Sequence, residues 1–371
     1  MEQIRIVREI KRNNLVFRLR KASRDPAMKG RIVLTDDLFT YVDFFYKQNP
    51  RRMNSGEGSY GEYRYLFYWE QARHFYNASK NLPIEAAPLT MYYCILNAVK
   101  SYLLYESKGD QEIQESLKMH GIQEGCNSKG KLYGKLEEIS LKRMEKGVFS
   151  CFSRMIDINF QNTWELNWQP EMKMLLGAVP FVHNAYITTY GLSKKKECFL
   201  PLRDGFPPEF SICSDKKIHL SVKLKKEYFS KTAVRLPEEI KESFRESFLI
   251  DTNDPFTLIS REGFEIEELK EKYCGLRSHF TYITSDQRIW YLKKFNAENK
   301  ALRLNDLTLI FALTHRFSEI VRYRPEQMKL ILDGKENWIV HEFLTMALDQ
   351  FIDRLAEEIT KREIMSTRHS N

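Results

Sequence analysis

The run from Pro88 to Ser107 limits the possible folds of this chain more than any other feature. Apolar residues recur in it at i, i+4 and i+7, the period of one helix face: Met91, Ile95, Ala98, Val99, Tyr102 and Leu103. Pro88 suits the first turn of a helix, where its missing N–H leaves no hydrogen bond unmade. Because so broad an apolar stripe must be covered by other elements, the run predicts a long helix inside a helical core.

Helical periodicity occurs on both sides of this run and again near the C-terminus. The predicted helices span residues 62–80, 88–107 and 171–190, a helix capped by Asn305 or Asp306 and ended by Pro325, and a last helix over residues 337–362. Residues 1–34 are compatible with either a short helix or an edge strand.

The β signal lies between these helical parts. Residues 218–225 alternate strictly, which predicts a strand with one apolar and one polar face, and residues 256–259 form a short candidate strand. Residues 279–283 and 288–292 flank a four-residue turn and predict a hairpin. We expect these strands to form one antiparallel sheet.

These elements predict a mainly helical α+β fold, with a small antiparallel β segment between N- and C-terminal helical parts. The predicted divisions are a basic N-terminal arm, a helical domain, a β-rich segment, and C-terminal helices that pack on the helical domain: residues 1–35, 36–195, 196–300 and 301–371.

Positive charge is concentrated in the N-terminal arm. The formal net charge is +8, and residues 1–30 contain nine Lys or Arg against three Asp or Glu. Such an arm can bind nucleic acid, an anionic membrane surface or an acidic protein, or it can be a solvated terminal segment.

The sequence also indicates the compartment. The N-terminus has no apolar signal region, and no run approaches the ~18 apolar residues that span a bilayer. The six cysteines form no C-x-x-C pair, so no zinc or thioredoxin-type motif is present. We expect a cytoplasmic protein with free thiols, without a metal site, a cofactor or a membrane partner.

Two blocks of the sequence resemble a known family. One is Pro88 to Leu104 followed by His120-Gly121-Ile122, and the other is Leu313 to Pro325, which ends in Arg-Tyr-Arg-Pro. Both resemble the YaaC-like family of bacterial proteins. The first block also resembles the core helix pair of HEPN domains, helical bundles of toxins and antiviral systems, and implies a HEPN-like bundle here. Active HEPN ribonucleases carry an Arg, four to six residues, then a His. This block contains no Arg, so the resemblance implies a non-catalytic core.

Basic residues near these blocks are candidate phosphate contacts. Arg322 and Arg324 lie with Arg316 at the end of a predicted helix, where the helix dipole also favours cations at ~0.3–1 kcal/mol each. Arg51 and Arg52 precede Gly56, Gly58 and Gly61, a literal G-x-G-x-x-G without the preceding strand that a dinucleotide site requires. A flexible loop is the simpler interpretation of these glycines.

Three residues are candidates for acid–base chemistry. Arg277 and His279 open the predicted hairpin, and His120 lies in the His-Gly turn. No carboxylate is placed by sequence to orient either imidazole, so structural roles compete with catalysis. His120 also suits a turn or cap.

The leading hypothesis is a non-catalytic, nucleic-acid-associated or defence-linked protein that binds phosphates of RNA or DNA through its basic residues. The alternatives are an interaction subunit with a protein partner, or a nuclease with an unusual site. Motifs of common hydrolases and P-loop NTPases are absent from the sequence.

Overall fold

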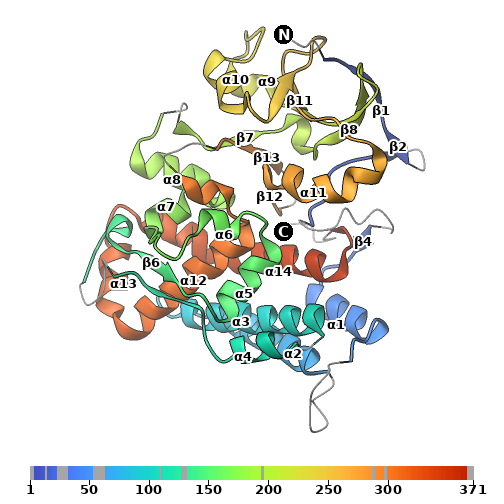
Figure 1. Cartoon of the computed structure of the whole chain (residues 1–371). Coiled ribbons are helices and arrows are strands. Elements are labelled where there is room, and N and C mark those ends of the chain that lie inside the picture. The colour runs from blue at the N-terminus through green and yellow to red at the C-terminus, as the bar shows by residue number, and fades with distance from the viewer. Residues whose placement is uncertain are drawn as a thin grey trace.

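The computed structural model confirms a mainly helical α+β fold, in which a helical part and a smaller β part lie side by side (Figure 1). The residues that the structure describes are 4–12, 15–22, 32–52, 63–108, 110–126, 132–193, 196–285, 289–295 and 299–365. All six cysteines are free thiols, as expected. Among the helices described, none combines the length and apolar composition needed to cross a bilayer.

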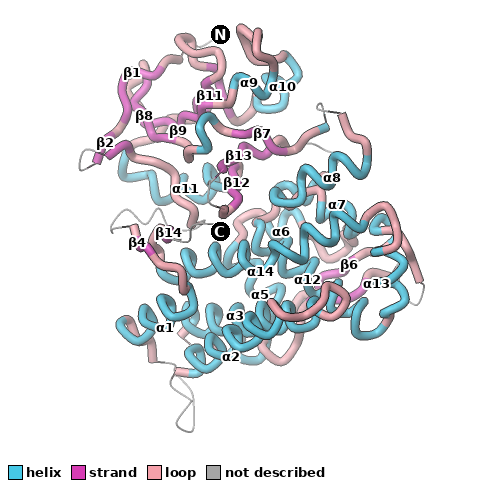
Figure 2. Tube along the Cα trace, turned by 180° about the vertical axis from the view of Figure 1, so that it is seen from behind, coloured by secondary structure: helices cyan, strands magenta, loops and turns pink. Residues whose placement is uncertain are grey.

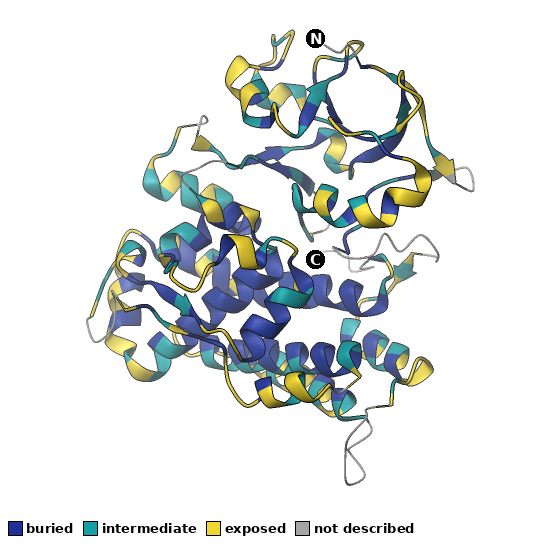
Figure 3. Ribbon diagram, viewed as in Figure 1, coloured by how far each residue is buried: buried dark blue, intermediate teal, exposed yellow. Residues whose placement is uncertain are grey.

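The helical part is built around α3 (Ala87–Ser107), which is buried on nearly all sides. Helices α2 (Arg64–Ser79) and α12 (Asp306–Tyr323) pack against it, and α14 (Asn337–Thr360) contacts both α3 and α12. The other helices of this part are α1 (Leu38–Gln48), α4 (Gln111–Ser116), α5 (Val148–Ile156), α6 (Phe160–Thr163), α7 (Met172–Leu176), α8 (His183–Tyr190) and α13 (Pro325–Leu332). Figure 3 shows α12 almost wholly buried, and α14 is fully buried from Gln350 to its end.

The ends of these helices follow the sequence signals. Asn305 caps α12 by accepting a hydrogen bond from the N–H of Leu307, and Pro325 opens α13. The predicted helix over residues 171–190 is wrong as a single helix. It ends at Leu176 and resumes at His183, because Pro180 cannot donate to the helical ladder and a short 3-10 turn takes its place.

The β part contains two sheets, so the prediction of one sheet is wrong (Figure 2). Five strands pair antiparallel in the order β1 (Ile6–Glu9), β8 (Glu209–Cys213), β9 (Ile218–Lys223), β11 (Thr257–Ser260) and β10 (Phe248–Ile250). The predicted hairpin, β12 (Phe280–Ile283) and β13 (Ile289–Lys293), pairs instead with β7 (Phe199–Pro201). Both edges of β9 are already occupied by β8 and β11, so the hairpin cannot pair with β9.

Shorter elements complete the chain. They are α9 (Lys226–Phe229), α10 (Glu238–Phe244), α11 (Leu269–Ser278), and the strand pairs β2 (Lys11–Arg12) with β3 (Leu15–Val16), β5 (Ile122–Glu124) with β6 (Leu141–Arg143), and β4 (Val33–Leu34) with β14 (Ile364–Met365). Single 3-10 turns occur at Leu136–Glu138, Pro180–Val182, Arg203–Gly205, Ile266–Glu268 and Lys300–Arg303.

Two main apolar cores correspond to the two parts. The larger core draws on residues between Phe39 and Phe199 and between Ala301 and Ile364. The second core draws on Phe17 and Leu19 together with residues between Leu200 and Leu292. The predicted polar face of β9 is also covered: His219 and Ser221 are buried, and His219 contacts the carbonyl of Ser260 at 2.7 Å.

Candidate functional site

Helices α3 and α12 bring a tyrosine and two histidines together, which we call the Tyr–His cluster: Tyr92, His120 and His315. The rings of Tyr92 and His315 meet edge to face with centroids 4.9 Å apart. His120, which follows α4, shares a hydrogen bond between its Nδ1 and the Tyr92 hydroxyl, and its ring centroid lies 5.7 Å from that of His315. The two sequence blocks that resemble the YaaC-like family therefore pack against each other.

Two glycines fix the position of His120. Gly121 and Gly147 have φ values of +83° and +115°, and a Cβ on Gly147 would lie 2.5 Å from the Cα of Gly121. This close approach lets Val148 and Phe149, at the start of α5, donate N–H hydrogen bonds to the carbonyls of Met119 and His120, each at 2.9 Å. The His-Gly turn is therefore held against the first turn of α5.

The electrostatics of the cluster keep both imidazoles neutral at neutral pH. Burial, together with the nearby His120 and arginines, lowers the pKa of His315 to about 3. His120 is exposed, and its pKa is lowered by partial desolvation and by the Arg322 and Lys100 cations. Burial raises the pKa of Tyr92, so its phenol stays protonated.

The carboxyl group of Glu319 lies next to the Tyr–His cluster. Glu319 Oε2 lies 3.7 Å from Nδ1 of His315, and burial raises the pKa of this carboxyl although Arg316 opposes the effect. An exposed neutral imidazole that shares a hydrogen bond with a phenol can accept or donate a proton at its outward nitrogen. The arrangement therefore has the parts of an acid–base site.

Three of the five arginines predicted as phosphate contacts lie on and after α12, but two of these three are held by a carboxylate. Arg316 donates to Glu124 of β5 at 2.7 Å, and Arg324 binds both oxygens of Glu124 at 2.7 and 2.8 Å. Arg316 also donates to Glu319 at 3.1 Å. The positive charges of Arg316 and Arg324 are therefore largely compensated within the fold.

Arg322 differs from its two neighbours. Its guanidinium lies 4.4 Å from the ring centroid of Tyr323, and its buried Nε has no hydrogen-bond acceptor within the described parts of the chain. The side chain of Tyr323 is 67% exposed. This leaves a cation and an aromatic ring at the surface beside His120.

Arg51 and Arg52 lie elsewhere. Arg51 stacks on Tyr105, 4.1 Å from its ring centroid, and pairs with Glu106 at 3.4 Å, while Arg52 is exposed after the end of α1. Tyr105 and Tyr92 are 13 residues apart on α3, which corresponds to about 20 Å along the helix. Arg51 therefore does not join the Tyr–His cluster. Gly56, Gly58 and Gly61 lie outside the described residues.

Arg277 and His279 belong to the β part and do not meet His120 either. The ring of His279 lies between Phe248 and Phe295, with centroids 5.4 and 5.1 Å away, and burial lowers its pKa to about 4. Arg277 is buried at the end of α11 and donates to the carbonyls of Lys21 and Phe280 at 2.9 and 2.6 Å.

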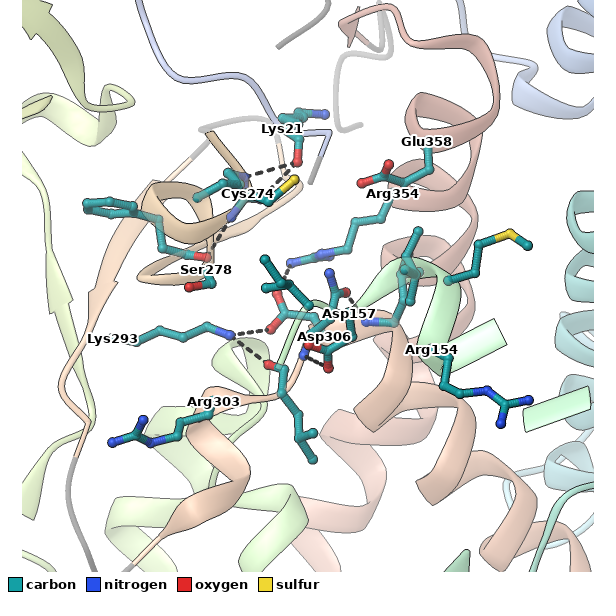
Figure 4. Close-up of a pocket in the computed structure, with 18 residues that line it drawn as sticks. Lys21, Arg154, Asp157, Cys274, Ser278, Lys293, Arg303, Asp306, Arg354 and Glu358 are labelled. Atoms are coloured by element: carbon teal, nitrogen blue, oxygen red, sulfur yellow. Dashed lines mark hydrogen bonds and ion pairs between the residues drawn. The ribbon is translucent and has the colours of Figure 1, made fainter. Parts of the chain in front are cut away.

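Arg277 also lines a cavity of about 270 Å³ where the helical and β parts meet, which we call the junction pocket (Figure 4). Its charged and polar lining residues come from segments far apart in the sequence: Lys21, Arg154, Asp157, Arg277, Ser278, Lys293, Arg303, Asn305, Asp306, Arg354 and Glu358. Sequence reasoning identified Asp306 only as a helix cap and did not identify the pocket, because no local pattern connects these residues.

Several basic residues of the predicted N-terminal arm form ion pairs with acidic residues elsewhere in the chain. Arg18 pairs with Glu209 at 2.9 Å, and Lys21 pairs with Asp353 and Glu357 at 3.0 and 2.9 Å. Within the described ranges, no group of three or more His, Cys, Asp or Glu residues is placed to hold a metal ion.

The fold defines an α+β protein whose two apolar cores are joined across a polar pocket, with a Tyr–His cluster in the helical part. The profile of the YaaC-like Protein family matches residues 40–359, most of the chain. The protein therefore belongs to the YaaC-like family, as its two sequence blocks indicate. No curated protein and no solved structure matches the chain.

Proposed function

We propose that this YaaC-like protein is a nucleic-acid-associated cytoplasmic protein with a HEPN-like helical core. The observation that carries the proposal is the surface formed by His120, Arg322 and Tyr323. There a guanidinium without a carboxylate partner in the described chain adjoins an imidazole and an exposed ring.

This combination suits a single-stranded nucleic acid. A guanidinium offers a fork of donors to a phosphate, and an exposed aromatic ring can stack on a base of any sequence. Lys100 adds positive potential at His120. Arg316 and Arg324 would act mainly by orienting the end of α12, because Glu124 already occupies their guanidinium groups. A role in defence against foreign nucleic acid follows only from the HEPN resemblance and forms part of the proposal.

The test is the salt dependence of binding to single-stranded RNA and DNA of several lengths, measured by fluorescence anisotropy. Log affinity should fall linearly with log salt. Arg322→Gln should reduce that slope by about 1, and Tyr323→Ala should weaken binding by about 1–3 kcal/mol with little change in slope. Arg73→Gln, in the exposed pair with Asp37, is the matched control. Absence of binding at low salt would contradict the proposal.

A second candidate is phosphodiester cleavage at His120. Its support is the hydrogen bond with Tyr92, which engages Nδ1 of His120 and leaves the other imidazole nitrogen available to a substrate. In the sequence, an Arg followed after six residues by a His occurs at Arg362 and His369, and His369 lies outside the described residues. Cleavage of labelled RNA should be lost in His120→Ala and retained in His279→Ala, and it should be assayed with chelator and with added divalent cations. No cleavage by the wild-type protein under either condition would leave the binding role alone.

A further inference from the structure

We propose that the junction pocket binds a small ligand that carries a phosphate group. The pocket is separate from the Tyr–His cluster, and its volume of about 270 Å³ lies at the small end for ligand sites. A cavity of this size suits a small molecule and not a nucleic-acid strand. The proposal therefore adds a second ligand class and does not depend on nucleic-acid binding.

The charge balance of the pocket favours an anion. Six basic side chains line it, against three acidic ones: Lys21, Arg154, Arg277, Lys293, Arg303 and Arg354, against Asp157, Asp306 and Glu358. Lys21 is compensated by Asp353 and Glu357 on α14, and Glu358 lies 3.9 Å from Lys361. The excess positive charge therefore comes from the other basic residues.

Asp306 lies at the centre of the buried cations (Figure 4). Lys293 and Arg354 approach its two oxygens at 3.4 and 3.2 Å, and Thr281 donates to it as well. The Arg277 cation also acts on this carboxyl and, with Lys293 and Arg354, holds its pKa below the ordinary value. One carboxylate is therefore shared by three cations at the centre of the pocket.

The hydrogen bonds of Arg277 also indicate a missing anion. Its side chain is 7% exposed, yet its hydrogen bonds go to the carbonyls of Arg20, Lys21 and Phe280, which carry no net charge. Among the described residues no carboxylate forms an ion pair with it. Asp306 acts on this guanidinium but is shared with Lys293 and Arg354, so Arg277 carries a desolvation cost that a nearby dianion would offset.

The remaining groups are compatible with this assignment. Asp157 accepts hydrogen bonds from the N–H groups of Asn159 and Asn305 at 2.9 and 2.7 Å, so its carboxylate oxygens are already engaged by backbone donors. The positive end of the α12 dipole also faces the pocket through Asn305 and Asp306. Arg154 and Arg303 point away from Asp306 in Figure 4 and would act on the ligand through their charge at the rim and not by direct contact.

The experiment uses the full chain with inorganic phosphate and glycerol phosphate as probes, and sodium chloride at matched ionic strength as the salt control. Isothermal titration calorimetry gives the affinity, and thermal unfolding gives an independent measure. At 100 times Kd the ligand should raise the unfolding midpoint by roughly 3 °C beyond the effect of chloride. Tighter binding of the ester identifies a phosphorylated small molecule, and equal binding identifies free phosphate.

The variants locate the binding. Arg277→Met should abolish it, and the rim double variant Arg154→Gln/Arg303→Gln should weaken it roughly tenfold without disturbing the buried network. Arg245→Gln, whose side chain is 74% exposed directly after the end of α10, should bind as the wild type does. If Arg277→Met does not fold, the rim variant decides. Equal affinity in the wild type and the rim variant, or a thermal shift no larger than that of chloride, would overturn the proposal. Arg322→Gln should leave binding unchanged, which separates this site from the nucleic-acid surface.

Discussion

Replacing Glu124 by Gln should destabilise the protein by about 3 kcal/mol. Glu124 accepts charge-assisted hydrogen bonds from Arg316 and Arg324 at 2.7–2.8 Å, and its side chain is only 15% exposed. Arg316 is 4% exposed and would remain buried with less compensation, a change that costs about 3–5 kcal/mol when a buried pair is broken. Glu319 still binds Arg316, and Arg324, at 22% exposed, can turn toward water, so we expect the lower end of that range.

The assay is thermal and urea unfolding of the wild type and the variant at neutral pH. With about 2.1 cal/mol/K of unfolding entropy per residue, 3 kcal/mol corresponds to a decrease of about 4 °C in Tm for this chain. The control is Asp43→Asn, which breaks the exposed pair with Lys47 and should cost less than about 0.5 kcal/mol. If the two variants are equally stable, Glu124 does not provide the compensation that its geometry indicates.

Three further predictions concern the surroundings of the candidate sites. Gly147→Ala should destabilise the protein by about 3 kcal/mol, because the added Cβ clashes with the backbone of Gly121. The control Gly191→Ala adds a Cβ in open space and should cost only about 1–2 kcal/mol for its positive φ, measured by thermal unfolding. Burial raises the pKa of Asp157 to about 6, so stability should fall by up to about 3 kcal/mol as pH rises from 4 to 6, and urea midpoints of Asp157→Asn should lack this slope. Burial lowers the pKa of His183 to about 4, so the free energy of unfolding of the wild type should fall by about 2 kcal/mol as pH falls from 7 to 5. If urea unfolding of His183→Leu shows the same loss of stability over this pH range, the prediction is wrong.

The helices could be predicted from the sequence because their signals are local. The stripe and first-turn proline of α3, and the Asn305 cap of α12, lie within a few residues of the elements they define. The sheets could not be predicted, because pairing depends on which strands compete for an edge. Nothing near residues 279–292 shows that β7 pairs with β13, or that the basic segment Ile6–Glu9 occupies the edge of β8.

The candidate sites divide in the same way. His120, Arg322 and the Tyr92 block could be selected from motifs, and the structure shows that they are neighbours. The ion-pair partner of Arg316 could not be predicted, because Glu124 lies 192 residues away in the sequence. The junction pocket could not be predicted, since its six cations come from six separate segments, and Arg277 was the only one of them selected from the sequence, for another role.

The polar contacts at the junction affect how the helical part and the β part can move relative to each other. The two apolar cores are separate clusters, and directional polar contacts such as Lys21 with Asp353 and Arg354 with Asp306 join the two parts. Beside these contacts, Phe199 and Tyr291 of the three-stranded sheet pack against the larger core. Buried ion pairs contribute little net stability compared with apolar packing, but they strongly favour one geometry. An anion in the pocket would therefore affect the relative position of the two parts more than the stability of either core. Hydrogen exchange should slow on phosphate binding at α11 and at the start of α12 while the amides of α3 stay unchanged, because α3 lies wholly within the larger core.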